Sequence, residues 1–275
     1  MHILRCPKCK GSLSPDRSGT ICNGCGKIYS LENDILIVTE QTHNFQMYGD
    51  KHPIYGSERP LPPENFWIEF VERYRDFQPS DIILDAGGGD SVWTASLDSR
   101  VRRIYNVDAS LYQLLKARKR DLRRSILING DVTQISFKDD CIDVIFEIYV
   151  FEHLSFKKAL KAIEEYYRIL KQGGLYLIVT ENPFGEYMYK RFLAKLLRRK
   201  FGTSDPTHIN MHFPRTVRKL LIENNFQIIA EWIPIIGENK TLFNWMFKQK
   251  PAKSFLELLF NISYGFLVKK SQSQY

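Results

Sequence analysis

The alternation of short apolar segments with amphipathic ones from residue 81 onward constrains the fold most. Strands are predicted at 81–85, 103–107, 125–129, 143–149 and 174–180, with helical spacing at 110–122 and 155–171 and further strands at 226–233 and 262–268. Ser155 is a candidate cap for the second helix, and Gly173 and Gly174 are expected to end it. Short strands joined by helical crossovers predict an α/β fold with a Rossmann-like, doubly wound and mostly parallel sheet.

Composition divides the 275-residue chain into three parts. Residues 1–40 are turn-rich and contain four of the five cysteines, which predicts a small domain of its own. Residues 41–63 are rich in proline and glycine and are expected to form a linker. Residues 64–275 contain the alternating pattern, begin with helical spacing near 63–77, and carry an aromatic, apolar insertion at 234–260.

Charge and hydropathy indicate a cytoplasmic protein. The chain has no apolar run of about 18 residues and no charged-then-apolar leader, so we expect neither a transmembrane segment nor a secretory signal. The net charge of +8 suits contact with polyanions but also simple solubility. The basic run 116–124 is interpreted as a solvated helix end. The basic amphipathic pattern near 186–201 fits either a peripheral membrane contact or a lid packed on the domain.

Two cysteine pairs near the N-terminus predict a metal site. Cys6 and Cys9 form one CxxC pair and Cys22 and Cys25 the other, with glycines close by. In a reducing compartment this pattern favours metal over disulfides, and four thiolates in a closed tetrahedron suit structural Zn²⁺ better than iron. A segment this short buries little apolar surface, so the metal is expected to supply its folding free energy. The fifth cysteine, Cys141, is interpreted as a small buried apolar residue.

The stretch "DIILDAGGGDSVW" places three glycines directly after the first predicted strand of the sheet. Ligands of such sheets bind where this strand turns into its helix, and glycine allows close backbone approach there. A dinucleotide fingerprint would need a third glycine where Val92 stands, and Asp90 would repel a pyrophosphate, so NAD is disfavoured. S-adenosylmethionine has no phosphate, and its cationic sulfonium and amino groups tolerate Asp85 and Asp90.

Acidic residues end the next two strands as well. Asp108 follows the second strand, where a carboxylate accepts from both hydroxyls of a ribose. Asp131 follows the third, placed to accept from an adenine amine while Val132 packs on the ring. Each acid alone is also typical of a helix cap or a turn. Three acids in register across consecutive strand ends favour a nucleoside-containing cofactor.

Residues 81–180 resemble the class I S-adenosylmethionine-dependent methyltransferases of the type 11 group. The matching motifs are "ILDAGGGDS", "VDAS", "NGDV", "DVIFEIYVFEHL" and "RILKQGGLYLIVTENPF". Ser91 stands where the last glycine of the family's motif is usual, and we expect only a local adjustment. The resemblance implies S-adenosyl-L-methionine as cofactor and a pocket lined by Asp85, Ala86, Gly87, Gly88, Gly89, Asp108, Ala109, Asp131, Val132 and Glu147.

The cysteine segment "CPKCKGSL…CNGCGKIYSLENDILIV" resembles the zinc-ribbon activator subunit of tRNA and rRNA methyltransferases. It is also similar to ribbons fused to bacterial methyltransferases, which end in an apolar segment as "DILIV" does here. This resemblance indicates RNA as an alternative substrate. An equally favoured interpretation is a ribbon that only packs on the catalytic domain or recruits a protein.

Methyl transfer needs an aligned acceptor and sometimes a base. Candidates are Glu152 and His153 of "FEHL" and Asp205, His208 and His212 of "SDPTHINMHF", of which we favour His208 and His153 as catalytic residues. A structural hydrogen bond is the alternative for either histidine. Some related enzymes bind Mg²⁺ through ExxEH, but Tyr149 replaces the first acid, so metal-assisted catalysis is not expected.

The sequence favours methylation of oxygen on a small-molecule, glycan or lipid-linked acceptor. One alternative is a tRNA or rRNA base methyltransferase, although the chain lacks the NPPY-like tetrapeptide of the amino-methylating enzymes. Another is a non-catalytic activator or scaffold that uses the fold for binding. The oligomeric state does not follow from the sequence.

Overall fold

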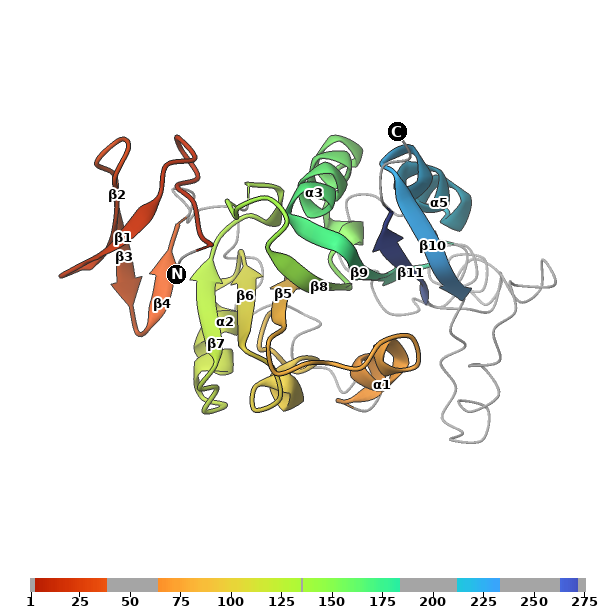
Figure 1. Cartoon of the computed structure of the whole chain (residues 1–275), viewed down its shortest axis with the longest axis horizontal. Coiled ribbons are helices and arrows are strands. Elements are labelled where there is room, and N and C mark those ends of the chain that lie inside the picture. The colour runs from red at the N-terminus through yellow and green to blue at the C-terminus, as the bar shows by residue number, and fades with distance from the viewer. Residues whose placement is uncertain (1–2, 39–63, 135, 184–211, 233–262, 272–275) are drawn as a thin grey trace, which may run out of the picture.

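A computed structural model describes residues 3–38, 64–134, 136–183, 212–232 and 263–271 (Figure 1). The described strands form one sheet in the order β1-β2-β3-β4-β7-β6-β5-β8-β9-β11-β10. Several predicted features lie outside the described residues. They are the linker at 41–63, the insertion at 234–260, the basic pattern near 186–201, Asp205 and His208.

The centre of the sheet is parallel. It consists of β5 (Ile82–Ala86), β6 (Arg103–Asp108), β7 (Ser125–Asn129), β8 (Ile142–Ile148) and β9 (Leu170–Glu181). Two antiparallel strands, β10 (Phe226–Trp232) and β11 (Ser263–Lys270), follow at one edge. The predicted Rossmann-like fold with a parallel sheet is confirmed for the strands from β4 to β9, and antiparallel strands at both edges make the whole sheet mixed.

The helices cover both faces of the sheet (Figure 1). On one face lie α3 (Phe156–Ile169) and α5 (Pro214–Glu223), and on the other α1 (Phe66–Glu72) and α2 (Leu111–Arg118). Ser155 caps α3 as predicted, since its hydroxyl accepts from the amide of Lys158 at 3.4 Å. The predicted end of this helix at 171 is wrong, because β9 begins at Leu170.

The cysteine segment extends the sheet at its other edge. Its strands are β1 (Leu13–Asp16), β2 (Gly19–Cys22), β3 (Ile28–Glu32) and β4 (Ile35–Ile37). The apolar strand β4 pairs in parallel with β7, with Ile35 beside Leu127 and Ile37 beside Asn129. Arg118 at the end of α2 forms an ion pair with Asp34, so its charge is partnered by the ribbon. Residues 3–38, which we call the ribbon, are therefore joined to the sheet through backbone pairing.

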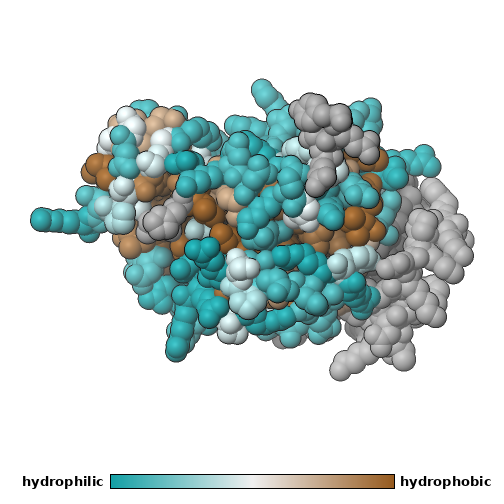
Figure 2. Space-filling model, viewed as in Figure 1, coloured by the Kyte–Doolittle hydropathy of each residue, from teal (hydrophilic) through white to brown (hydrophobic). Residues whose placement is uncertain are grey.

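The ribbon also covers a face of the sheet that a crossover helix would otherwise cover. Between β7 and β8 the described residues contain only the short 3₁₀ helix η3 (Val132–Gln134). Leu4, Tyr29 and Leu36 of the ribbon belong to the same buried cluster as Val107 and Ile128 of the sheet. Figure 2 shows a mainly hydrophilic surface, with apolar side chains emerging where the ribbon meets the rest of the molecule. The ribbon thus shares the main hydrophobic core.

No helix within the described ranges is long and apolar enough to cross a membrane.

Candidate functional site

The glycine turn follows β5 at the carboxyl edge of the sheet. Gly87 and Gly89 have positive φ angles of 68° and 50°, which favour glycine. A Cβ at Gly88 would lie 2.3 Å from the carboxyl carbon of Asp85, and one at Gly87 would lie 2.3 Å from a methyl of Val150. The turn is therefore packed from both sides, and substitution by any larger residue would displace it.

Ser91 adopts the left-handed conformation that a glycine would adopt at the end of this motif, with φ 61°. Its buried hydroxyl lies 2.5 Å from the side-chain nitrogen of Asn106, which also donates to the carbonyl of Gly89 at 3.1 Å. The departure at Ser91 is thus accommodated by a hydrogen bond from β6. Sequence analysis missed Asn106, although a polar residue inside the apolar stretch "RIYNV" marks it.

Asp108 is hydrogen-bonded to the glycine turn at its inner side. Its carboxylate accepts from the backbone amide of Gly89 at 2.9 Å and from that of Ser110 at 2.6 Å. Burial, with a smaller contribution from the charge of Asp90, raises the pKa of Asp108 to about 6. The predicted cofactor acid and the predicted glycine turn are therefore in direct contact.

Asp85 lies beneath the turn and is almost fully buried. Thr94 donates a hydrogen bond of 2.6 Å to its carboxylate, but burial and the charges of Asp108 and Asp90 raise the pKa of Asp85 to about 7. Asp90 itself pairs with Arg120 at 3.0 Å. The turn thus gathers three carboxyl groups, only one of which has a cationic side chain as partner among the described residues. Such a site favours a cationic ligand.

Asp131 and its neighbours continue this edge at the end of β7. The Asp131 carboxylate accepts from the amide and hydroxyl of Thr133 at 2.8 and 2.7 Å and pairs with Lys158 at 3.2 Å. Burial opposes its ionisation, but these hydrogen bonds and the Lys158 ammonium outweigh burial and lower the pKa of Asp131. Val132 is buried, and Ala109 is half-buried with its carbonyl bonded to Asn129. One oxygen of Asp131 is thereby engaged locally and the other by a lysine.

Glu147 lies inside the core, and this placement disagrees with the expected role as a pocket residue. It is fully buried, with Tyr166 donating to one carboxylate oxygen at 3.1 Å and Tyr176 donating to the other. Burial raises the pKa of Glu147 to about 7. Alternation along β8 directs Glu147 towards the α3 face, as it does Ile145. Its carboxylate therefore faces the tyrosines and not the carboxyl edge.

A second polar cluster follows β8 and β9 at the same edge. Glu152, in the 3₁₀ helix η4 (Phe151–His153), is buried and accepts from the hydroxyl of Thr180 at 2.8 Å. Burial and, to a smaller extent, the charge of Glu152 raise the pKa of Tyr264 well above its ordinary value. The Tyr264 hydroxyl donates to the carbonyl of His212 at 2.6 Å. Buried polar groups at this density are unusual in a core and mark a candidate functional site.

The imidazole of His212 is the least satisfied member of this cluster. It is buried, its Nε2 has no hydrogen-bond partner among the described residues, and its ring meets that of Phe151 edge-on at 4.9 Å. Burial lowers the pKa of His212. His153 is half-buried at the end of η4. Close by, Tyr149 has a positive φ of 58°, a strained conformation typical of functional sites. Of the two histidines in these motifs that the structure describes, His153 is more exposed than His212, and His212 belongs to the cluster.

The four ribbon cysteines converge as predicted from their spacing. The Sγ atoms of Cys6, Cys9, Cys22 and Cys25 all lie within 4.8 Å of one another, with Cys6–Cys25 at 3.8 Å and Cys9–Cys22 at 3.3 Å. Tetrahedral zinc with bonds of about 2.3 Å separates its sulfurs by about 3.8 Å. Burial opposes ionisation of Cys6, but hydrogen bonds led by that of the Tyr29 hydroxyl lower its pKa to about 6. The donor set fits structural Zn²⁺. Cys141 is buried, as expected.

The central part of the chain is similar to known proteins. Residues 84–178, which span the glycine turn through β9, match the family described as "Methyltransferase domain". An uncharacterized methyltransferase of Geobacillus thermodenitrificans is 29% identical over 93 residues, or 34% of this chain and 43% of that protein. The "Probable S-adenosylmethionine-dependent methyltransferase" of Mycolicibacterium smegmatis is 26% identical over 137 residues, or 47% of this chain and 52% of that protein.

The chain thus spans about half the length of the curated relatives it matches. A similar solved structure belongs to the complex between the Haloferax volcanii Trm112 methyltransferase activator and a methyltransferase. It superposes with a TM-score of 0.55 at 14% identity, over 74% of this chain and 89% of that chain. At this identity the likeness shows the fold alone.

Proposed function

We propose, on the premise that this chain carries a class I methyltransferase domain, that it transfers the methyl group of S-adenosylmethionine to an oxygen of an acceptor molecule. The observation that carries the proposal is the contact between Asp108 and Gly89, because it joins the glycine turn to the acid that ends β6. A turn held open by glycine beside a ribose-binding acid suits a nucleoside cofactor. The carboxyl groups of Asp85, Asp90 and Asp108 suit the positive charges of this cofactor.

In this proposal each predicted residue has a stated task. Gly87, Gly88 and Gly89 let the methionine end approach the backbone, with Ala86 and Asp85 beneath the turn. Asp108 accepts from the ribose hydroxyls while Ala109 packs beside them, and Asp131 and Val132 hold the adenine. Glu147 is left out of this set, because its oxygens are bonded to tyrosines in the core. S-adenosylmethionine supplies an activated methyl group on a sulfonium.

The acceptor is proposed to lie against the cluster of Glu152, Thr180 and His212. Val150 touches Gly87, so the segment that leads into this cluster borders the glycine turn. Glu152 is the base that this geometry favours. With S-adenosylmethionine bound, the cofactor would supply its sulfonium methyl group to the acceptor oxygen, and the Glu152 carboxylate would accept the proton that this oxygen loses. His153 and His208, the catalytic residues predicted from the sequence, remain proposed acceptor-site residues.

The acceptor class remains a small molecule, a glycan or a lipid-linked intermediate. The favouring observation is the depth of the Glu152 cluster, since the buried Glu152 and Thr180 suit a group that enters a confined site. A nucleic-acid acceptor is the second candidate, favoured by the net charge of +8 and by the ribbon. The proposed structural Zn²⁺ at the four cysteines then stabilises the ribbon beside the sheet.

The deciding experiment follows labelled methyl from S-adenosylmethionine into host extract, separated into RNA and organic fractions. Asp108→Ala protein serves as the blank. Label in the organic fraction supports the preferred acceptor class, and label in RNA supports the second candidate. Absence of label from both, together with no binding of S-adenosylmethionine by the wild-type protein, contradicts the function and favours the non-catalytic scaffold.

A further inference from the structure

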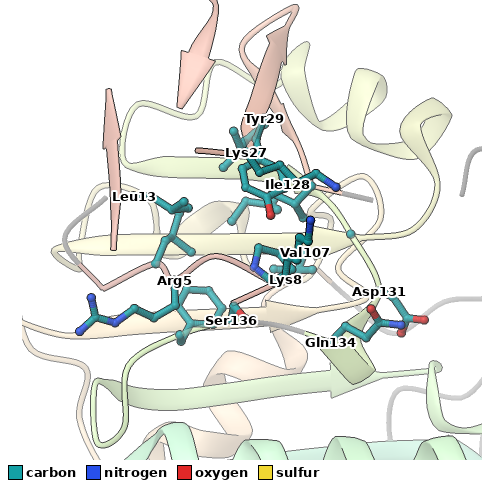
Figure 3. A pocket seen from close by; sticks show the side chains of 16 residues that line it. Arg5, Lys8, Leu13, Lys27, Tyr29, Val107, Ile128, Asp131, Gln134 and Ser136 are labelled. Carbon is teal, nitrogen blue, oxygen red and sulfur yellow. The ribbon is translucent and has the colours of Figure 1, made fainter. Parts of the chain in front are cut away.

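A cavity of about 410 Å³ lies between the ribbon and the sheet (Figure 3). This volume falls within the range of about 300–1,000 Å³ that is typical of ligand sites. The ribbon contributes one wall, and the ends of β6 and β7 with the segment after η3 contribute the other. The four cysteines, the glycine turn and the Glu152 cluster do not line it, whereas Asp131, which we assign to the proposed adenine site, forms part of its lining.

The charge of the cavity is positive. Arg5, Lys8 and Lys27 line it from the ribbon. Among the residues that the structure describes, no ion pair or side-chain hydrogen bond engages Arg5 or Lys8. Asp131 is the single acid in the described lining, and Thr133 and Lys158 already bind its carboxylate. The labelled cationic side chains of Figure 3 extend from the ribbon, with Asp131 and Gln134 on the opposite side. The cavity therefore favours an anion.

Much of the remaining lining is apolar. Leu13, Val107 and Ile128 contribute aliphatic surface. The ring of Tyr29 is fixed because its hydroxyl lies 3.0 Å from Sγ of Cys6. A bare inorganic anion would leave this surface in contact with water, whereas an anion attached to a planar or apolar body would cover it.

We propose that this cavity binds an organic phosphate, whose phosphate group is held by Arg5 and Lys8 and whose body packs against Val107 and Ile128. A phosphate accepts several charge-assisted hydrogen bonds at once, so a guanidinium and an ammonium that line the same cavity suit it. Both cations come from the ribbon and both apolar contacts come from the sheet. The site therefore exists only where the two are joined, which gives the fused ribbon a binding role besides its structural one.

The test uses the full chain saturated with S-adenosylhomocysteine, so that no nucleotide probe enters the cofactor site. Calorimetry measures the binding of uridine monophosphate, uridine and inorganic phosphate. We expect uridine monophosphate to bind more tightly than either of its parts. We expect Arg5→Ala and Lys8→Ala each to weaken it roughly tenfold, since each removes a charge-assisted hydrogen bond. Lys8→Arg retains the charge and is expected to bind like the wild type.

The matched control is Lys219→Ala, which removes an exposed lysine of α5 at the other end of the sheet (Figure 1). Its affinity for uridine monophosphate should equal that of the wild type. Zinc content and melting temperature of each variant verify that the ribbon remains folded. Failure of uridine monophosphate to bind, or equal affinities in the wild type, Arg5→Ala and Lys8→Ala, overturns the proposal.

A short single-stranded oligoribonucleotide distinguishes the sources of the phosphate. Much tighter binding than uridine monophosphate, with a steep salt dependence that Lys8→Ala reduces, supports the site with RNA as the source. Equal affinities for the oligoribonucleotide and for uridine monophosphate support a small phosphorylated molecule as the ligand of the cavity. The inference does not depend on the proposed methyl transfer. If S-adenosylhomocysteine binds but uridine monophosphate does not, only the proposal for the cavity is contradicted. If S-adenosylhomocysteine does not bind, the methyltransferase proposal is contradicted.

Discussion

The carboxylate of Asp108 accepts a hydrogen bond from the backbone amide of Gly89 at 2.9 Å, which fixes the glycine turn to the neighbouring strand. The two residues are far apart in sequence and come together because β5 and β6 pair in parallel. This contact places a carboxylate at the floor of the turn. It also means that one acid serves both the shape of the turn and the proposed ribose site.

Asp108→Ala should weaken binding of S-adenosylmethionine at least about 100-fold, because it removes two proposed hydrogen bonds to a charged acceptor. Isothermal calorimetry measures the loss. Asp76→Ala, which changes an exposed aspartate outside the site, is the control. An unchanged affinity in Asp108→Ala would refute the cofactor assignment.

Cofactor binding should strengthen as pH rises from about 5 to about 8. The pKa values of Asp85 and Asp108, about 7 and about 6, lie above the ordinary 3.8. A carboxyl group whose pKa is higher in the folded protein than in the unfolded chain stabilises the folded state fully below pH 3.8. This stabilisation is lost as the pH rises through the pKa of the folded state. The unliganded protein therefore loses this contribution as the carboxyls ionise, and a cationic ligand offsets the loss. The increase in melting temperature that the cofactor causes should become larger as the pH is raised. Asp108→Asn should reduce this pH dependence. A rise independent of pH would contradict this explanation.

Variants of Ser91 distinguish the effect of backbone strain on stability from the effect of its hydrogen bond. Ser91→Gly relieves the positive φ but loses the bond to Asn106, so the free energy of unfolding should change by less than about 1 kcal/mol. Ser91→Val places a β-branched side chain at the same φ and should cost more than about 2 kcal/mol. Urea denaturation measures both. Equal stabilities of the two variants would show that the left-handed conformation is not retained.

Removal of the proposed zinc should loosen the sheet edge as well as the ribbon. β4 pairs with β7, and Lys10 donates to Ser136 at 2.8 Å beside the backbone bond from Arg5 to that residue. After chelation, hydrogen exchange should accelerate in β7 and in the segment after η3, while amides of β8 and β9 stay protected as an internal control. Unchanged protection of β7 would mean that the sheet edge is independent of the metal.

Glu152→Gln should lower methyl transfer about 100-fold or more while leaving cofactor affinity unchanged, as expected for loss of a general base. Thr180→Val removes the hydrogen bond to Glu152 and should have a smaller effect. A melting curve identifies variants that fail to fold. Full activity in Glu152→Gln would exclude it as the base.

The sequence by itself determined the elements whose evidence is local. Hydrophobic periodicity predicted the parallel strands, the glycine run marked the turn after β5, and the two CxxC pairs identified the four cysteines that converge in the ribbon. Asp108 and Asp131 were found because the carboxyl ends of parallel strands share one edge. These predictions rest on spacing along the chain, which folding preserves.

Only the tertiary structure decided which groups meet across distant segments. Alternation along β8 and the two tyrosines moved Glu147 from the expected pocket into the core. Asn106 became the partner of Ser91 through the pairing of β5 with β6. The pairing of β4 with β7 turned a segment that resembles a separate ribbon into one wall of a cavity. Burial and contact depend on the packing of all elements together, and no local pattern encodes them.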